Sequence, residues 1–244
     1  MRVVLASLLC VMMFDAASFA AREVRQEEVR FKGGESSTTI TDTIKGDQSV
    51  DYRLQAKAGQ TLAVSFKPGN LSAYFNLLPP GSNDVAMFVG STSGNYVERV
   101  LPGDGVYVVR VYLMRSAARR NESSNFTLNL KVTGKALEAL PSSMDATLPG
   151  TPFHASTRVS CVPLLASGQQ DCEAFVVRRS FDGTATVEIH PAGAPTRRIL
   201  FIREEPKASD SQDEMIFTRQ ADLITVKFAN EEWYEIPKAL ISGG

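Results

Sequence analysis

The sequence predicts an all-β protein built from two small domains, the first an antiparallel β-sandwich, behind a cleaved signal peptide. Short runs rich in β-branched and aromatic residues recur along the 244 residues. Glycine, proline, asparagine and aspartate bound each run and supply the backbone angles that chain reversals require. The pattern lapses once, near the middle of the chain. A hydrophobic content of 43% is enough for an ordinary globular core.

The first 20 residues have the pattern of a secretory signal peptide. Arg2 is positively charged, the stretch from Val3 to Phe14 is mostly apolar, and small residues stand at −3 and −1 of a cleavage site after Ala20. The apolar stretch is too short to span a bilayer, which takes about 20 residues, and no later stretch approaches that length. We therefore expect Cys10 to be removed and the mature protein to be periplasmic or secreted, without a membrane span.

Residues 21–135 are predicted to form the first domain. Its expected strands are 49–54, 61–66, 74–78, 85–89, 106–113 and 126–132. The last has the clearest alternation, because apolar side chains at every second position from Phe126 to Val132 are separated by polar ones. Such a strand places one face in a core and the other in water. Strands at this spacing favour a sandwich.

A linker is expected at residues 136–150, where the alternation gives way to a short helical turn or an irregular segment containing Pro141 and Pro149. A second β domain follows over residues 151–244. Its expected strands are 174–177, 184–189, 199–202, 223–228 and 233–236.

Two cysteines remain after removal of the signal peptide, Cys161 and Cys172. An even pair at short spacing in an oxidising compartment indicates a disulfide that staples a hairpin or loop. Two free buried thiols are the alternative.

The charge balance argues against a nucleic-acid partner, since the formal net charge is −1 and the isoelectric point is near 6.2. The charge is unevenly divided. Residues 21–135 hold 15 Lys and Arg against 11 Asp and Glu, whereas residues 136–244 hold 10 against 15. An anionic partner should therefore meet the first domain, although a chance asymmetry of a solvated surface would look the same.

The chain lacks the components of most enzyme sites. Its two histidines, His154 and His190, stand in no catalytic motif, and the acidic residues Asp210, Asp213 and Glu214 lack the glycine and the closing glutamate of a calcium loop. No spacing suggests a glycosidase pair of carboxylates. We expect no enzyme activity, no metal and no cofactor.

Two segments have the composition of binding loops. The first, residues 90–96, is a run of small polar residues that ends in Tyr96 and would project as a hairpin tip. The second runs from Tyr112 to Glu122 and holds Arg115, Arg119 and Arg120. Arginines crowded on a loop repel one another unless they meet an anion or an internal acid such as Glu122. Plain turn chemistry and pairing within the domain would explain both segments without a ligand.

Residues 46–133 resemble the periplasmic inhibitors of g-type lysozyme. The resemblance rests on Asp51-Tyr52, Ala58-Gly59-Gln60-Thr61-Leu62, Tyr74-Phe75-Asn76, Pro79-Pro80-Gly81, Gly90 to Asn95 and, most specifically, Arg110 to Glu122. This family is similar, more distantly, to the β-sandwich of pre-peptidase C-terminal domains. The second half departs from the family, and nothing in its sequence names a function.

The resemblance implies an inhibitor of g-type lysozyme, with that enzyme as its protein partner. Bacterial lysozyme inhibitors of several folds are similar in using a Ser-Gly-x-(x)-Tyr loop that enters the enzyme's cleft, and Ser93-Gly94-Asn95-Tyr96 matches the shorter form. The lysozyme-binding residues implied are Ser93, Gly94, Asn95, Tyr96, Tyr112, Arg115, Arg119 and Arg120. The alternative is a non-catalytic sandwich module that binds envelope glycan or an envelope protein.

Overall fold

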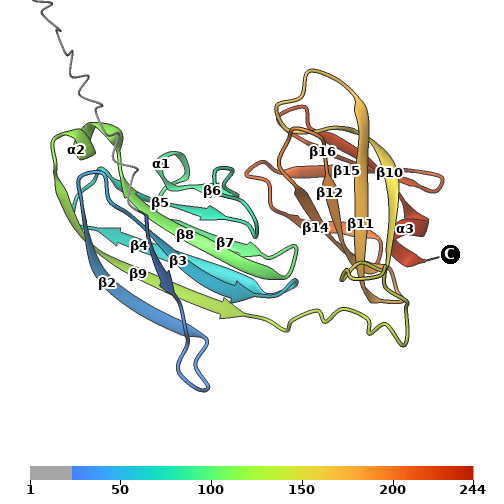
Figure 1. Ribbon diagram of the computed structural model, residues 1–244, viewed down its shortest axis with the longest axis horizontal. Coiled ribbons are helices and arrows are strands. Elements are labelled where there is room, and N and C mark those ends of the chain that lie inside the picture. The colour runs from blue at the N-terminus through green and yellow to red at the C-terminus, as the bar shows by residue number, and fades with distance from the viewer. Residues whose placement is uncertain (1–23, 244) are drawn as a thin grey trace, which may run out of the picture.

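A computed structural model describes residues 24–243 of the chain, which form two β domains side by side (Figure 1). The predicted signal peptide, with Cys10 and the cleavage site after Ala20, lies outside the described residues. No helix among the described residues is both long and apolar enough to cross a membrane. The prediction of an all-β protein of two domains is confirmed.

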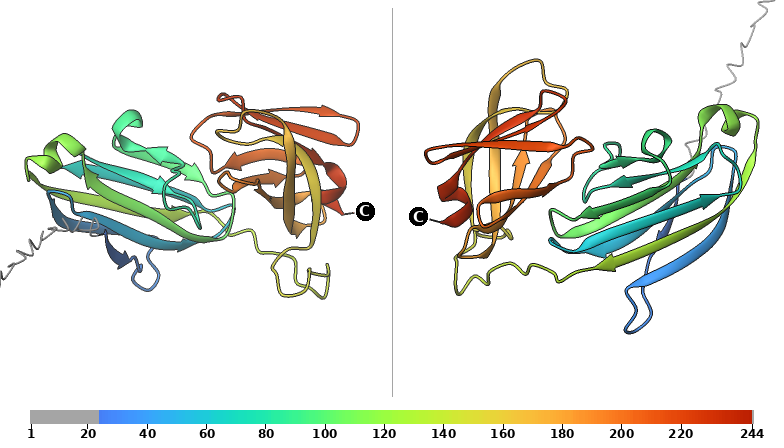
Figure 2. Two further views of the ribbon diagram at one scale, coloured as in Figure 1. Left: turned by 45° about the horizontal axis from the view of Figure 1, so that its top comes forward. Right: turned by 180° about the vertical axis from the view of Figure 1, so that it is seen from behind.

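The first domain is a sandwich of two sheets. The five-stranded sheet has the order β1 (Val24–Glu28), β3 (Ser49–Ala56), β8 (Gly105–Leu113), β5 (Ala73–Leu78) and β6 (Phe88–Val89). The four-stranded sheet has the order β2 (Ser37–Lys45), β9 (Ser123–Thr133), β4 (Thr61–Pro68) and β7 (Tyr96–Val100). All pairs are antiparallel except β1 with β3, which is parallel. Figure 2 shows the two layers from two sides.

The core of the sandwich lies between the inner faces of these sheets. In β9 the buried and exposed residues alternate as the sequence predicts, with Phe126, Leu128 and Leu130 inside. Phe66 of β4 packs edge-on against Phe75 of β5 with 5.8 Å between ring centroids, which joins the two layers. Alternate side chains of every core strand therefore bury apolar area between the sheets, the main favourable contribution to folding.

Three strands of the sandwich are not among those predicted. β2 is rich in threonine, β1 is fully exposed, and β7 follows directly on the small-residue segment 90–95. Each lies at an edge of its sheet, where half of the backbone pairing and one face are free of the core. The hydrophobic pattern is therefore weakest in these strands. Of the strand expected at 85–89, only Phe88–Val89 forms.

The second domain is one eight-stranded antiparallel sheet with the order β14, β13, β12, β11, β10, β17, β16, β15. The bounds are β10 Ala155–Val162, β11 Gln170–Ser180, β12 Thr184–His190, β13 Arg197–Ile202, β14 Glu205–Ser209, β15 Met215–Gln220, β16 Leu223–Phe228 and β17 Trp233–Pro237. Arg219 of β15 donates to the carbonyl of Glu204, beside β14, at 2.8 Å, so the sheet curls until its two edges meet. The short helix α3 (Lys238–Ser242) packs Leu240 and Ile241 into the core.

A cluster of charged side chains is buried in the second domain. The guanidinium of Arg197, 4% exposed, donates to both oxygens of Glu232 at 2.6 and 3.0 Å and to Asp210 at 3.0 Å. Tyr234 donates its hydroxyl to Glu232 at 2.7 Å. Both carboxylates are therefore satisfied, which is the condition for holding such groups away from water.

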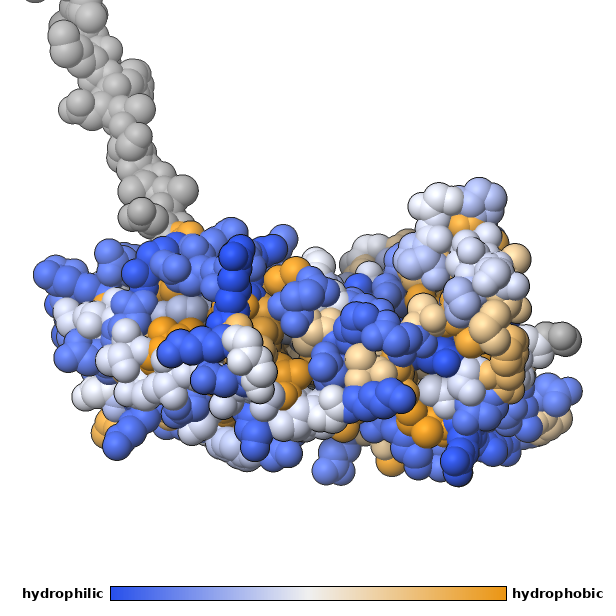
Figure 3. Space-filling model, turned by 90° about the horizontal axis from the view of Figure 1, so that it is seen from below, coloured by the Kyte–Doolittle hydropathy of each residue, from blue (hydrophilic) through white to orange (hydrophobic). Residues whose placement is uncertain are grey.

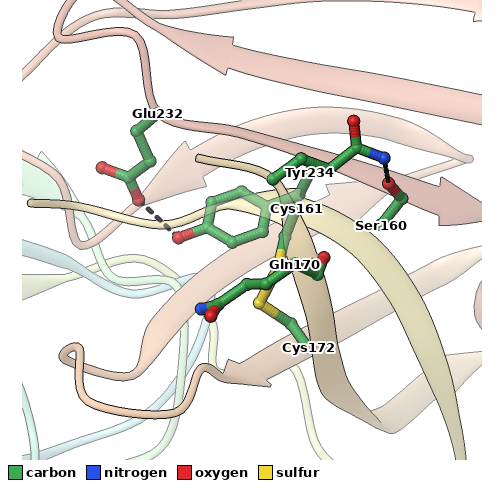
Figure 4. The surroundings of a disulfide bond; sticks show 7 residues. Ser160, Cys161, Gln170, Cys172, Glu232 and Tyr234 are labelled. Atoms are coloured by element: carbon green, nitrogen blue, oxygen red, sulfur yellow. Dashed lines mark hydrogen bonds between the residues drawn. A yellow bond between two sulfur atoms is a disulfide. The ribbon is translucent and has the colours of Figure 1, made fainter. Parts of the chain in front are cut away.

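The predicted disulfide joins Cys161 of β10 to Cys172 of β11 (Figure 4), with 6.1 Å between the Cα atoms. The two residues are diagonal neighbours in the ladder, since Cys161 faces Gln170 and Cys172 faces Val159. The bridge closes the base of the loop 163–169, where Gln169 also donates to Ser160 at 2.7 Å. The bridge therefore restricts the conformations that this loop can adopt.

Replacing both cysteines with alanine is expected to lower the free energy of unfolding of the second domain by about 2–4 kcal/mol. The bridge restricts the unfolded chain, and its loss restores that entropy. Urea unfolding followed by the fluorescence of Trp233 measures the change. Reductant should lower the free energy of unfolding of the wild type to that of the double variant and should not change that of the variant. Alkylation of both thiols without reductant would contradict the bridge.

The two domains are joined by arginine and threonine side chains of the second, which bond to main-chain carbonyls of the first domain and of the segment that follows it, and to one carboxylate. Arg179, with a side chain 1% exposed, bonds to Asp104 at 3.1 Å and also donates to the carbonyl of Leu137. Thr186 donates to the carbonyl of Pro102 at 2.7 Å, and Arg198 to that of Pro80 at 2.9 Å. These bonds hold the end of the sandwich formed by the turns around residues 80 and 103.

A small apolar cluster completes the junction. Ala58 of the sandwich and Leu137 of the connecting segment pack against Leu200 and Ala208 of the second domain. The connecting segment, residues 135–154, is extended apart from two turns, in which Met144 donates to the carbonyl of Pro141 at 2.8 Å and Thr151 to that of Leu148 at 3.0 Å. It runs along the second domain, where the amide of Leu140 donates to the carbonyl of Arg178 at 2.8 Å.

Polar side chains cover most of the molecular face drawn in Figure 3, and apolar side chains appear there in small separate areas. Isolated apolar residues are normal on a soluble protein surface. A cluster of exposed apolar side chains beside unpaired charges is a better indication of a protein interface than an isolated apolar residue.

Candidate functional site

The predicted binding segment 90–96 connects the two sheets of the sandwich at their edge. Gly90–Ser93 form a single helical turn, α1, after β6 of one sheet, and Tyr96 begins β7 of the other. The carbonyl of Asn95 accepts from the amide of Phe66 at 2.9 Å. The expectation of a hairpin tip was wrong, because β6 pairs with β5 and β7 pairs with β4.

Two glycines are required for this connection. A Cβ at Gly90 would lie 2.4 Å from the carbonyl oxygen of Phe75, so only glycine lets α1 begin against β5. Gly94 has φ of +95° and ends α1, in a region that favours glycine. Nothing lies within 4 Å of a Cβ built there, so space remains at the tip.

The side chains of Ser93, Asn95 and Tyr96 are exposed. Tyr96 is 57% exposed and donates its hydroxyl to Glu98, two residues along β7, at 2.6 Å. This hydrogen bond raises the pKa of Tyr96 above its usual value, which itself lies well above neutral pH. The ring therefore lies along the outer face of the four-stranded sheet. We call Ser93, Gly94, Asn95 and Tyr96 the tyrosine loop.

The predicted arginine segment is helical where a loop was expected. Arg115–Arg119 form the short helix α2, which Ala117 and Ala118 anchor in the core. The helix stands at the end of the sandwich that is farther from the second domain (Figure 1). Its anchoring by two small buried residues leaves the arginine side chains on the solvent side.

One of the three arginines is paired within the domain. Arg120 donates to Glu122 at 2.6 Å, and Asn70 donates to the other oxygen of Glu122 at 2.8 Å. The hydrogen bonds from Asn70 and Arg120 lower the pKa of Glu122, which stays ionised. Among the described residues, Arg115 and Arg119 have no acidic partner. These two cations are therefore available to an anion.

Tyr112 lies on the other outer face of the sandwich. It donates its hydroxyl to Asn76 at 3.2 Å, and its ring lies 6.4 Å from that of Tyr74, on the five-stranded sheet. Tyr96 belongs to the outer face of the four-stranded sheet. The structure therefore divides the predicted residues into two groups: the tyrosine loop, and an arginine end made of Tyr112, Arg115 and Arg119.

The two groups lie toward the same end of the sandwich. Asn95 is tied to Phe66 in the second half of β4, and Glu122 beside α2 is tied to Asn70, just beyond the end of β4. In Figure 1, α1 lies between α2 and the second domain. A single large partner can therefore reach both groups from that end.

Leu71 is a surface residue that the sequence interpretation did not select. It is 86% exposed in the turn before β5. The amide of Met114, itself 42% exposed, donates to the carbonyl of Ser72 at 2.8 Å, so Leu71 lies beside the start of α2. The available signal was an apolar residue directly after the turn sequence Pro68-Gly69-Asn70. Exposed Leu and Met beside unpaired Arg and Tyr give the composition of a protein interface.

Both histidines make contacts within the chain. His154 is 6% exposed, with Nε2 at 2.9 Å from the carbonyl of Leu140 and Nδ1 accepting from the amide of Arg178 at 3.0 Å. It ties the connecting segment to β11. His190 packs against Phe175 with 5.0 Å between ring centroids. Residues 24–243 contain no group of three or more His, Cys, Asp and Glu side chains that could hold a metal.

Comparisons with known proteins identify relatives of about half the chain. The inhibitor of g-type lysozyme from Escherichia coli K12 is 27% identical over 128 residues, which are 52% of this chain and 93% of that protein. The crystal structure of Aeromonas hydrophila PliG, a periplasmic inhibitor of g-type lysozyme, matches with 30% identity and a TM-score of 0.44 over 46% of this chain and 100% of its own. That of Salmonella Typhimurium PliG matches with 28% identity and a TM-score of 0.37, over 45% and 98%. No family model matches the chain.

Proposed function

We propose that this protein, whose first domain is related to inhibitors of g-type lysozyme, is itself a non-covalent inhibitor of g-type lysozyme in the periplasm. The observation that carries the proposal is the sequence match over 93% of the Escherichia coli inhibitor. That relative is an inhibitor protein and not an enzyme, which agrees with the lack of a catalytic motif in this chain. The relatives of known structure are periplasmic, in agreement with the predicted signal peptide.

The tyrosine loop suits a lysozyme cleft, which is a groove shaped for hydroxyl-rich sugar around a catalytic acid. Ser93 offers a hydroxyl on a narrow tip, and Gly94 adds no side chain where cleft walls are close. Tyr96 supplies rigid amphipathic area, and its bond to Glu98 holds the ring before binding. A ring held in place loses less entropy on association.

The arginine end supports the same partner by charge. Arg115 and Arg119 are exposed and lack an acidic partner among residues 24–243. They would form charge-assisted hydrogen bonds with carboxylates at the cleft, and they would also speed encounter with an anionic site. Leu71 and Met114 would add apolar contact beside them.

The proposal is tested by titrating the purified protein against g-type, c-type and i-type lysozymes in a cell-wall clearing assay. We expect inhibition of the g-type enzyme at concentrations that leave the other two active. The protein alone should clear no cell wall, because it is not proposed to be an enzyme. Full activity of the g-type enzyme at saturating protein would overturn the proposal.

A further inference from the structure

The second domain holds a hollow on its surface. It has a volume of about 420 Å³ and lies between the loop 163–169 and the turn that joins β16 to β17. Trp233, the only tryptophan of the chain, lines it together with Phe228, Lys227, Glu231 and Ser167. The volume falls within the roughly 300–1,000 Å³ typical of small-molecule sites.

Trp233 presents its indole ring on the outer face of the sheet. Its neighbour Tyr234 is fully buried, so alternation along β17 turns Trp233 outward, and the residue is partly exposed. It lies directly across from Val162 of β10 and Lys227 of β16. The hollow is thus lined by a partly exposed aromatic residue whose cross-strand neighbours are apolar on one side and cationic on the other.

Both walls of the hollow are held in place. The loop 163–169 is closed at its base by the Cys161–Cys172 disulfide. In the opposite turn, Asn230 accepts from the amide of Glu232 at 3.1 Å, and Phe228 donates its amide to the carbonyl of Glu232 at 2.8 Å. A site whose walls are fixed before binding avoids most of the entropy cost of ordering them.

The rim carries polar groups that the protein itself does not use. Lys227, Glu231 and Ser167 are exposed, and none has a hydrogen bond or ion pair within the part of the chain that the structure describes. They offer donors, an acceptor and a hydroxyl that can act as either. One cation and one anion cancel, and the second half of the chain is acidic overall, so the hollow favours a neutral ligand over an anion.

We propose that this hollow binds a pyranose ring of a neutral polysaccharide, stacked on Trp233 and held by hydrogen bonds to Lys227, Glu231 and Ser167. A sugar ring presents an apolar face of C–H groups to an aromatic plane and a rim of hydroxyls to polar side chains. The shallow, outward-facing shape admits a ring within a chain as well as a free sugar. The site is independent of the lysozyme-binding groups, which belong to the other domain.

Because Trp233 is the only tryptophan, its fluorescence reports on the hollow directly. We would titrate the purified protein with an N-acetylglucosamine tetramer and, separately, with a glucose tetramer. We expect a saturable change in Trp233 emission with at least one of them. A response to the first alone identifies an amino-sugar glycan of the cell-wall type, whereas a response to both identifies polysaccharide in general. No response to either, together with no retention on purified peptidoglycan, overturns the proposal.

A blocking variant locates the binding without disturbing the core. Gly168 lines the hollow and a Cβ built there meets nothing within 4 Å, so Gly168→Tyr adds a large side chain at the rim without a clash. We expect the affinity for glycan to fall at least tenfold. Thermal unfolding and inhibition of g-type lysozyme should be unchanged. Phe181→Ala, which removes an aromatic ring that is 60% exposed outside the hollow, is the matched control and should bind normally. Normal binding by Gly168→Tyr, or retention on peptidoglycan that sugar oligomers do not compete, overturns the proposal.

Discussion

Arg197→Ala is expected to lower the free energy of unfolding of the second domain by about 3–5 kcal/mol. The substitution leaves Asp210 and Glu232 as neighbouring carboxylates with side chains 0% and 1% exposed, deprived of the guanidinium that both contact. Removing one partner of a buried ion pair costs far more than the pair contributes, because an uncompensated charge remains away from water. Arg198 donates its amide to Asp210 at 2.9 Å and moderates the loss.

Urea unfolding followed by Trp233 fluorescence measures this effect in the second domain, because Trp233 begins β17 directly after Glu232. Arg203→Ala is the control. Its side chain is 82% exposed and stands 3.8 Å from Asp182, so the variant should change stability by less than about 0.5 kcal/mol. A loss of less than 1 kcal/mol in Arg197→Ala would show that the cluster is not buried as described.

Ser93→Ala combined with Tyr96→Ala is expected to weaken inhibition of g-type lysozyme at least tenfold, about 1.4 kcal/mol, without affecting folding. Both side chains are exposed, and neither contributes to the core. Arg115→Ala combined with Arg119→Ala should produce a loss of similar size that diminishes at high salt, because exposed charges are screened. The inhibition constant of each double variant, at low and at high salt, provides the comparison.

Arg120→Ala is the matched control for the arginine pair, since Arg120 is already paired with Glu122 and should leave inhibition nearly unchanged. The quadruple variant tests the division of the site into two groups. Losses that add within about 0.5 kcal/mol indicate that the tyrosine loop and the arginine end contact separate parts of the enzyme. Unchanged inhibition in the Ser93 and Tyr96 variant would remove the tyrosine loop from the mechanism.

The sequence predicts those parts of the fold whose signal is local. Strand β9 follows from its alternation, and the disulfide from an even pair of cysteines in a secreted chain. Strands β1 and β2 escape prediction because an edge strand needs no strong apolar pattern when its partner supplies the register. The parallel pairing of β1 with β3 is likewise a property of the partner and not of the segment itself.

In the candidate site too, features with a local signal in the sequence can be predicted and features that depend on strand pairing cannot. Residue types select the segments that hold Tyr96 and Arg115 as candidates, the family resemblance implies a binding role for them, and both residues are exposed. Their separation onto an edge and an end of the sandwich depends on which strands pair, which is non-local. The hollow beside Trp233 depends on strands β10, β16 and β17 meeting across more than 70 residues of chain, so no motif in the sequence announces it.

Three of the hydrogen bonds at the junction between the domains use main-chain carbonyls, two from the sandwich and one from the connecting segment. Arg198 and Thr186 bond to the carbonyls of Pro80 and Pro102, and Arg179 bonds to that of Leu137. Every residue carries a carbonyl, so these three bonds require the course of the chain and not the identity of the residue. A sandwich that keeps these turns, Asp104 and Ala58 could differ elsewhere on its surface and still accept the same second domain. The first domain can therefore change its exposed surface, including the tyrosine loop and the arginine end, without disturbing these three bonds.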